Sequence, residues 1–309
     1  TTGTLLFSPS YPLQEYEGYG EDDPFLISLK NDTYLRTSEL FLLNDETIYL
    51  DSEGEVVTGL QMTLKDFGKS IKASGKANKA TFKVLNEVQR AFGLEETDYV
   101  DEQVYLDLLP ALLIYKDPEA AYDVFWYYGD YGQYEYLNAC LLALNGKYWE
   151  AYQAFENLDY LDSEERAKAC IQKWPNNGVL WKNKSYSSAN TELTIAVYAS
   201  SDSAMFIKLY NGYNYDHVAS LFIGGSGKAT VSLPSGHYII KDGVGSLWFG
   251  PEDAFGYYGD YETMTFDDGS QIAYFENGYG YTLSINIETA TGGKGVGSEY
   301  ESYEGFVGI

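Results

Sequence analysis

The residues that could do acid–base or metal chemistry are few and scattered in this chain of 309 residues. His217 and His237 are its two histidines, and each falls in a predicted strand without a nearby partner, so both are expected to be structural or exposed. No cluster of His, Cys and carboxylate residues has the spacing of a zinc site. No Gly-x-Ser-x-Gly motif marks a nucleophile. The 46 Asp and Glu residues are too abundant to single out a glycosidase pair.

Two short motifs have simple structural interpretations. Residues 224–230, "GGSGKAT", are too short for a phosphate-binding loop and stand in a predicted hairpin. Asp267, Asp268 and Gly269 are expected to form a hairpin turn, with a calcium site as the alternative. We therefore predict no catalytic residue, no metal site and no cofactor.

Aromatic side chains, which can stack on flat ligands, are the chemistry that this sequence offers. Residues 121–140, "AYDVFWYYGDYGQYEYLNAC", contain six tyrosines, and a second aromatic group lies in the Gly-rich connection 245–262. Loops on a rigid scaffold commonly carry binding. The alternative for the second group is that Trp248 and Phe255 close the end of a sandwich. The candidate contact residues are Trp126, Tyr127, Tyr131, Tyr134, Tyr136, Trp248, Phe249, Tyr257 and Tyr258.

The charge of the chain excludes two classes of partner. Its 20 Lys and Arg residues stand against 46 Asp and Glu residues, which gives a net charge of -26. Such a surface repels nucleic acid and anionic lipid. We interpret the acidity as a source of solubility, with calcium capture as the alternative. The sequence contains no run of 18 apolar residues, so no membrane insertion is expected. No signal-peptide pattern is visible at Thr1, but this does not argue for a cytoplasmic location.

Helical spacing dominates residues 51–115, after an irregular, β-leaning segment at 1–50. Val56, Leu60, Leu64 and Phe67 recur at the spacing of one helix face, and Gly68 ends that helix. A second helix carries apolar residues from Phe82 to Phe92 and ends at Gly93, and a third begins near Asp101, a candidate N-cap.

Residues 52–114 resemble the peptidoglycan-binding domain of cell-wall hydrolases and their relatives. The matching pairs are Leu60-Gln61, Phe67-Gly68, Ser74-Gly75, Ala80-Thr81, Val88-Gln89 and Gly93-Leu94, in the order of the family. The resemblance implies an all-helical fold and a loop at Ser74, Gly75, Asn78 and Thr81 that would contact peptidoglycan. The loop departs from the family at Ser74, Ala77 and Asn78. Two alternatives stay open: retained wall binding, or a purely structural or protein-contacting domain.

A repeat organises residues 116–176. Residues 121–140 align without gaps on residues 151–170, with six identities that include Cys140 and Cys170. Self-similarity at this period is typical of stacked helical hairpins. The two copies resemble the tetratricopeptide-type repeats of secreted Gram-positive proteins (residues 117–175), and the helix ending near Leu113 is expected to cap the first hairpin. Equivalent positions in packed helices lie too far apart for a disulfide, so both thiols are predicted to be free and buried.

The repeat divides the aromatic residues of its first copy. Tyr122 and Phe125 recur in the second copy, and Tyr128 aligns with Leu158, so these three are expected to be framework. The five candidates between Trp126 and Tyr136 mostly align with polar residues, so either a neighbouring domain covers them or they form an exposed patch. The expected apolar stripes of the second helices are Leu137, Cys140, Leu141 and Leu144, and Ala167, Cys170, Ile171 and Trp174.

Residues 180–290 alternate with the period of β-strands. The predicted strands are 192–199, 204–210, 217–224, 227–234, 236–243, 261–268, 270–276 and 280–288. Short strands with close turns predict an antiparallel β-sandwich. The hairpin "ATVSLPSGHYIIKDG" resembles those of prealbumin-like sandwiches, and the Gly-rich tail 291–309 is expected to be partly disordered.

The sequence thus predicts a multidomain α+β protein without enzymatic activity. The leading hypothesis is an extracellular, cell-wall-associated or secreted protein of a Gram-positive bacterium, which contacts peptidoglycan through its helical domain. The alternatives are a protein-interaction scaffold or adhesin, and a carbohydrate-binding module that uses the sandwich loops. The expected partners are peptidoglycan or another glycan, or a surface protein.

Overall fold

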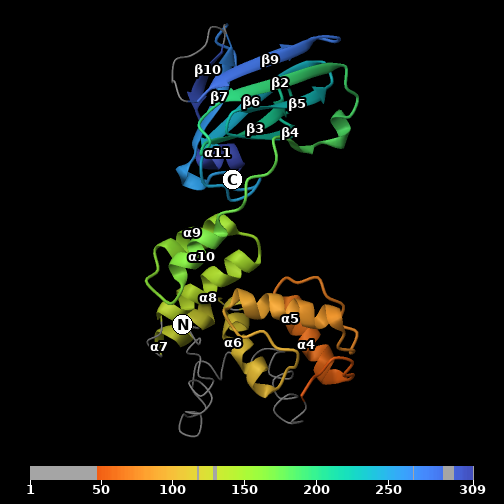
Figure 1. Cartoon of the computed structure of the whole chain (residues 1–309), viewed down its shortest axis with the longest axis vertical. Coiled ribbons are helices and arrows are strands. Elements are labelled where there is room, and N and C mark those ends of the chain that lie inside the picture. The colour runs from red at the N-terminus through yellow and green to blue at the C-terminus, as the bar shows by residue number, and fades with distance from the viewer. Residues whose placement is uncertain (1–46, 117, 128–130, 267, 288–295, 309) are drawn as a thin grey trace. The chain divides into compact units, whose positions relative to one another are not determined.

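The computed structural model describes residues 47–116, 118–127, 131–266, 268–287 and 296–308 (Figure 1). The chain divides into two compact units, Thr1–Cys170 and Ile171–Ile309. In the described residues, the first unit is helical, and strands dominate the second. The predicted mixed α+β class is therefore confirmed. Most of the predicted β-leaning segment 1–50 lies outside the described residues.

The described residues of the helical unit begin with three helices: α4 (Glu55–Asp66), α5 (Lys79–Ala91) and α6 (Glu102–Lys116). Their ends follow local signals in the sequence. Gly68, with φ of 76°, adopts the left-handed conformation that favours glycine just after α4. The Asp101 carboxylate accepts a hydrogen bond from the Val104 amide at 2.9 Å, so the predicted N-cap of α6 is confirmed.

In the described part of this unit four further helices follow: α7 (Pro118–Tyr127), α8 (Tyr131–Leu144), α9 (Tyr148–Glu156) and α10 (Ser163–Cys170). Helix α6 packs against α7 and α8, so the expected capping of the first hairpin is confirmed. The stripe predicted for α10 is wrong at Ile171 and Trp174, because the helix ends at Cys170. Trp174 instead packs on Phe222 of the β unit, with ring centroids 6.2 Å apart.

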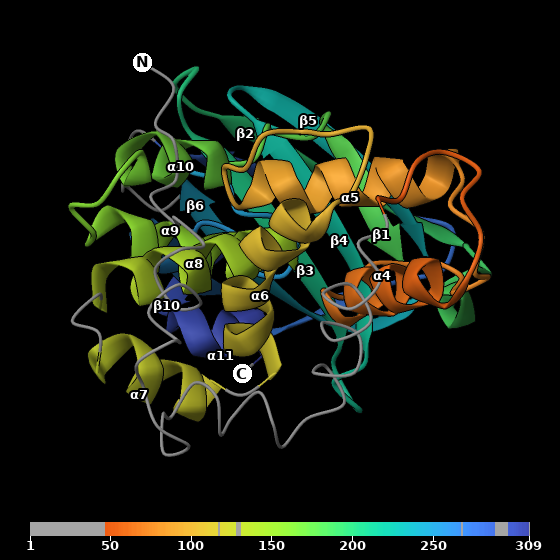
Figure 2. The same cartoon turned by 90° about the horizontal axis from the view of Figure 1, so that it is seen from below.

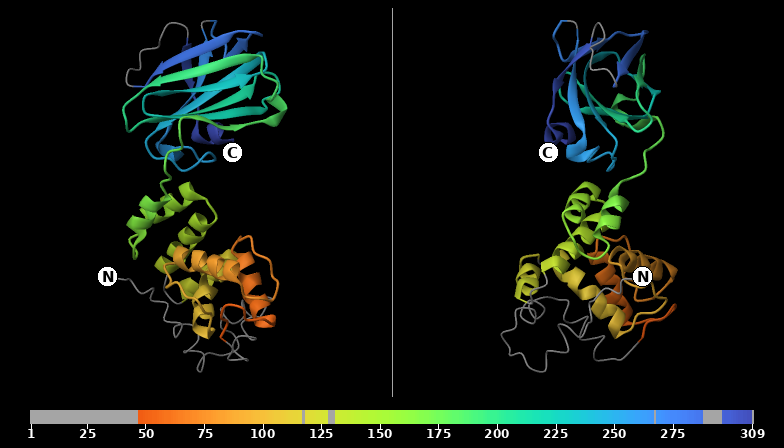
Figure 3. Two further views of the ribbon diagram at one scale, coloured as in Figure 1. Left: turned by 45° about the vertical axis from the view of Figure 1, so that its right-hand side comes forward. Right: turned by 60° about the vertical axis from the view of Figure 1, so that its left-hand side comes forward.

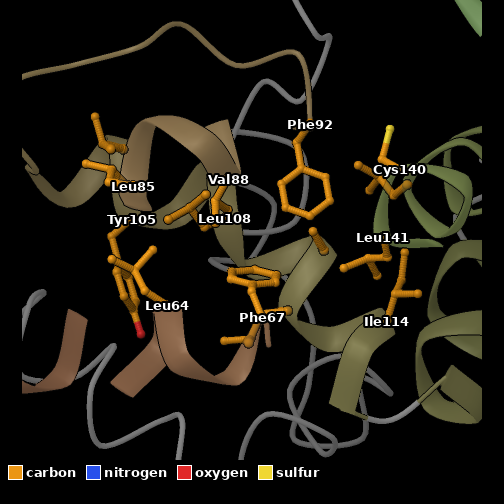
Figure 4. Packing of buried hydrophobic residues seen from close by; sticks show 14 of the residues in the cluster. Leu64, Phe67, Leu85, Val88, Phe92, Tyr105, Leu108, Ile114, Cys140 and Leu141 are labelled. Carbon is orange, nitrogen blue, oxygen red and sulfur yellow. The ribbon is translucent and has the colours of Figure 1, made fainter. Parts of the chain in front are cut away.

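One hydrophobic core runs through the whole helical unit. Buried side chains of α4, α5, α6 and α8 meet in it, and Phe67 and Phe92 pack with ring centroids 5.4 Å apart (Figure 4). The same cluster extends to Phe155 and Cys170. The segments predicted as two helical domains, 51–115 and 116–176, therefore share a single core up to residue 170.

The β unit contains two sheets, which form two layers (Figure 3). The larger sheet has the order β1-β4-β3-β6-β7-β10, with β8 paired to β6, and the smaller has the order β5-β2-β9. The strands are β1 (Gly178–Lys182), β2 (Thr191–Tyr198), β3 (Ala204–Asn211), β4 (His217–Gly224), β5 (Gly227–Leu233), β6 (Gly236–Gly245), β7 (Asp260–Phe266), β8 (Ile272–Phe275), β9 (Gly280–Asn286) and β10 (Val296–Tyr300).

The eight strand predictions are confirmed to within two residues at each end, but the expected antiparallel pairing is wrong at one place. Strands β2 and β9 pair in parallel, from Glu192 with Gly280 to Tyr198 with Asn286. About 80 residues separate these strands in the chain, so no local turn specifies their direction. Strand β1 was not predicted.

The larger sheet is covered on both faces. Met205, Ile207 and Leu209 of β3 belong to the core between the sheets. Phe206 alternates with them, and its ring lies 5.0 Å from Trp248 and 6.0 Å from Phe306. A second apolar layer thus lies on the outer face of this sheet, which explains why β3 is buried from Ala204 to Leu209.

The end of the chain supplies part of that outer layer. Strand β10 pairs with β7, and helix α11 (Tyr303–Val307) places Phe306 in the layer, where it is fully buried. The expectation of a partly disordered tail is therefore wrong for residues 296–308. Gly-rich composition suggested flexibility, but strand pairing and burial of Phe306 and Tyr303 order this segment.

Candidate functional site

The loop between α4 and α5 is held in place by one buried side chain, and can be followed in Figure 2. Gln61 is fully buried in α4. Its Nε2 donates to the Lys76 carbonyl at 2.9 Å and to Thr81 Oγ1 at 3.0 Å. Its Oε1 accepts from the backbone amides of Ser74 at 2.8 Å and Gly75 at 3.0 Å. These four bonds hold residues 74–76 against α4 and the start of α5.

The four residues predicted to contact a ligand in this loop have different roles. Ser74 and Asn78 are exposed and Gly75 is half-buried. Thr81 is fully buried, so its prediction as a contact residue is wrong. Gly75 has φ of 70°, which explains the glycine at this turn. Only the surface around Ser74 and Asn78 is open to a ligand.

Asn78 is also a framework residue, because it caps α5. Its Oδ1 accepts from the amides of Ala80 at 2.9 Å and Thr81 at 3.1 Å, and Thr81 Oγ1 accepts from the Asn78 amide at 3.3 Å. This reciprocal pair is a capping box.

Replacing Asn78 by alanine is expected to lower the free energy of unfolding of the helical unit by about 1 kcal/mol, because two amides lose their acceptor. Urea unfolding followed by helical circular dichroism measures this loss. Asn78→Ser, which keeps an acceptor oxygen at the cap, is the matched control and should lose much less. Equal losses in the two variants would contradict the capping role.

Lysines are concentrated in and beside this loop. Six of the 20 basic residues of the chain lie between residues 65 and 83, with Asp66 as the sole acidic residue there. We name residues 65–83 the lysine segment. Its lysines are exposed except for the half-buried Lys69: Lys65, Lys69, Lys72, Lys76, Lys79 and Lys83. The net charge of -26 masks this local basic stretch, which a count of charges in short windows of the sequence reveals.

Ion pairs in the described residues neutralise part of this charge. Lys76 Nζ lies 2.9 Å from Glu53 and 3.8 Å from Asp51. Asp66 pairs with Lys116 at 3.0 Å. Lys72, Lys79 and Lys83 are exposed and take part in none of the ion pairs found among the described residues. These three side chains therefore present positive charge to solvent.

The aromatic residues of α7 and α8 form an exposed group. Trp126 is 69% exposed, Tyr131 46% and Tyr122 42%. The rings of Tyr122 and Tyr131 lie 5.7 Å apart, and half-buried Tyr134 contacts both. The expectation that Tyr122 is buried framework is wrong, because α7 lies at the margin of the unit. The side chains of Tyr127 and Tyr128 lie outside the described residues.

Tyr136 is 1% exposed, so its prediction as a surface contact is wrong. Its hydroxyl donates to Asp162 at 2.6 Å, and the Arg166 guanidinium lies 5.2 Å from its ring centroid. Arg166 also donates to Asp162 at 2.9 Å and to the Ala91 carbonyl, at the end of α5, at 2.6 Å. This cluster ties three helices together, so Tyr136 is structural. Repeat alignment placed Tyr136 and Arg166 at equivalent positions but could not show that they touch.

Cys140 and Cys170 are both buried and neither forms a disulfide, so the prediction that the two thiols are not bridged is confirmed. Burial raises the pKa of the Cys140 thiol to about 12 and that of Cys170 to about 11. Both therefore stay protonated near neutral pH and act as small apolar residues.

The second predicted aromatic group divides into buried and exposed members. Trp248 is 3% exposed and Phe249 1%, so neither contacts a ligand at the surface. The Trp248 ring packs against Phe222 and Phe255 at 4.9 Å and 5.5 Å. Trp248 and Phe255 are thus buried, as the alternative interpretation expected, but they lie in the layer on the outer face of the larger sheet and not at the end of the sandwich. Tyr257 and Tyr258 are 57% and 52% exposed.

The remaining polar motifs have structural partners. His237 Nδ1 lies 2.7 Å from the Tyr213 hydroxyl, and His217 Nε2 lies 2.9 Å from Ser220 Oγ. Gly269, with φ of 76°, donates its amide to the Phe266 carbonyl at 2.8 Å, as expected for a turn; Asp267 lies outside the described residues. Within the described ranges, no three His, Cys, Asp or Glu side chains are grouped to hold a metal ion.

No protein-family model matches this chain, and no curated protein is significantly similar to it. In the described part of the chain, every helix is too short or too polar to cross a bilayer.

Proposed function

We propose that this protein is a non-enzymatic binding protein of the Gram-positive cell surface, and that its helical unit contacts peptidoglycan through the lysine segment. The observation that carries the proposal is the exposed positive charge of residues 65–83, on a loop that Gln61 holds in one conformation. A preformed loop binds without the entropy cost of ordering it. The resemblance of residues 52–114 to a peptidoglycan-binding domain supports the same surface.

Electrostatics favours this segment over the rest of the surface. Outside it, the chain has 14 basic and 45 acidic residues, which repel an anionic wall. Exposed charges farther apart than about 8 Å are largely screened at physiological ionic strength, so the local positive charge acts on a ligand in contact with it. Carboxylates of peptidoglycan stem peptides are suitable partners for exposed ammonium groups.

The test is retention on purified peptidoglycan. A variant with Lys72, Lys79 and Lys83 replaced by glutamine is expected to bind about tenfold more weakly, a loss of about 1.4 kcal/mol. Raised salt should weaken the wild type more than the variant. The matched control replaces Lys173, Lys184 and Lys228, which are exposed in the β unit, and has the same net charge. Equal retention of both triple variants, or no retention of the wild type, would refute the proposal.

A second candidate function, a protein-interaction scaffold or adhesin, is supported by the exposed aromatic group of α7 and α8. Aromatic residues are enriched where proteins bind one another. The retention assay shows whether this group instead makes the wall contact, with Trp126 and Tyr131 replaced by serine. If this variant loses retention on peptidoglycan while the lysine variant keeps it, the aromatic group and not the lysine segment makes the wall contact. For the alternative of a carbohydrate-binding module, the buried residues Trp248 and Phe249 are no longer candidate contacts.

A further inference from the structure

The β unit contains a pocket of about 610 Å³ on the outer face of its larger sheet. This volume is typical of sites for small molecules. The polar and aromatic residues that line it are Trp181, Lys208, His217, Ser220, Glu252 and Asp253. None of them belongs to the lysine segment or to the exposed aromatic group of α7 and α8.

Strand register brings these side chains together. Ser220 of β4 is paired with Lys208 of β3 on one side and with Trp181 of β1 on the other. Directly paired residues point to the same face of a sheet, so the three share the outer face. Glu252 and Asp253 come from the turn that follows Trp248 and Phe249.

Lys208 provides a buried positive charge in this pocket. It is 6% exposed, and its Nζ donates to the Phe306 carbonyl at 3.0 Å and lies 4.8 Å from the Phe306 ring centroid. No ion pair found among the described residues includes it. A buried charge is costly unless it is paired. Burial, with help from nearby Lys241, lowers the pKa of Lys208 to about 8, and the charge of Asp253 opposes this shift only in part. A bound anion would offset that cost.

The rest of the pocket combines an aromatic surface with hydrogen-bonding groups. Trp181 is 46% exposed and stacks on His217 at 4.6 Å, with the rings 18° from parallel. Ser220 is 3% exposed, and its Oγ forms a hydrogen bond with His217 Nε2. The carboxylates of Glu252 and Asp253 accept hydrogen bonds from donors such as hydroxyl groups.

We propose that this pocket binds a sugar-sized ring that carries a carboxylate, such as a uronic acid. The apolar face of the ring lies on Trp181, its carboxylate pairs with Lys208, and its hydroxyls donate to Glu252 and Asp253. This site lies wholly in the β unit and is independent of wall binding by the lysine segment.

The combination of groups disfavours simpler ligands. A neutral sugar leaves the Lys208 charge unpaired. A small anion leaves Trp181 unused, and an aromatic acid offers no hydroxyl donors to Glu252 and Asp253.

The test is calorimetric titration of the full chain with D-glucuronate at pH 7. Glucose, benzoate and acetate are the matched probes, because each lacks the carboxylate, the hydroxyls or the ring. D-glucuronate is expected to bind at least about tenfold more tightly than any of the three, a difference of about 1.4 kcal/mol. No binding of D-glucuronate, or equal binding of glucose, benzoate or acetate, would overturn the proposal.

Two variants locate the binding. Lys208→Met keeps the apolar stem but removes the charge, and Trp181→Ala removes the aromatic surface; each is expected to weaken D-glucuronate binding about tenfold or more. Lys228→Met, at an exposed position of β5, is the control and should bind like the wild type. Trp181 is half-exposed, so its variant remains informative if Lys208→Met fails to fold. Unchanged affinity in a folded Trp181→Ala protein would place the ligand elsewhere and overturn the proposal.

Discussion

Replacing Gln61 by alanine is expected to lower the free energy of unfolding of the helical unit by about 3 kcal/mol. The side chain is fully buried and makes four hydrogen bonds, to Ser74, Gly75, Lys76 and Thr81. Removing it leaves buried donors and an acceptor without partners, and each such group costs about 1–3 kcal/mol. Water can reach part of the exposed loop and satisfy some of these groups, so the total loss of stability is smaller than the sum of their separate costs.

Two measurements check this prediction. Urea unfolding gives the loss of stability, and amide hydrogen exchange at Ser74 and Gly75 shows whether the loop opens locally. Met62→Ala is the control, because the adjacent Met62 side chain is 53% exposed on the same helix and should cost less than about 1 kcal/mol. Unchanged exchange at Ser74 and Gly75 would show that Gln61 does not hold the loop. If the proposed function is correct, the Gln61→Ala variant should also be retained less on peptidoglycan, because the loop is no longer held in place.

The second large effect concerns Asp242, which lies buried in β6. It is 5% exposed and paired in register with Glu262 of β7. Burial, and secondarily the charge of Glu262, raises the pKa of the Asp242 carboxyl to about 8. An aspartate in the unfolded chain has a pKa of about 3.9. The folded state therefore holds a proton that the unfolded state releases.

This difference makes the stability of the β unit depend on pH. The contribution of protonated Asp242 is complete below about pH 4 and is lost as pH rises to about 8. Between these limits the free energy of unfolding is expected to fall by up to about 1.4 kcal/mol per pH unit. Asp242→Asn cannot ionise, so its stability should fall much less over this range and exceed that of the wild type at pH 8.

Urea titrations at several pH values, followed through NMR signals of residues in β6, measure this effect. Asp260→Asn is the control, because Asp260 is exposed on the adjacent strand and carries the same charge. Parallel stability profiles of the wild type and Asp242→Asn would contradict the prediction. A slope reduced equally by both variants would show that net charge, and not the buried carboxyl, causes it.

Much of the secondary structure was predictable, because it depends on neighbouring residues. Asn78 and Asp101 cap helices, and Gly68 ends one, through contacts within four residues. Strand β4 spans His217–Gly224 as predicted, since alternation and flanking turns are local signals. The absence of a disulfide between Cys140 and Cys170 was also predicted, from the distance between packed helices.

Side-chain exposure in the candidate sites was harder to predict, because it depends on what covers each residue. Trp126 and Tyr136 stand ten residues apart in the same aromatic run, yet one is 69% exposed and the other 1%. Trp248 was a candidate loop contact but is 3% exposed, because its ring packs against Phe206, Phe222 and Phe255. Composition alone cannot distinguish these cases.

The sequence by itself determined the helical and β-rich parts of the chain, most element boundaries and the charge of the lysine segment. Only the tertiary structure decided the parallel pairing of β2 with β9 and the meeting of Trp181, Lys208 and Ser220 in one pocket. The physical reason is the range of the interactions. Caps, turns and periodicity act within a few residues, whereas strand register and burial join residues tens of positions apart.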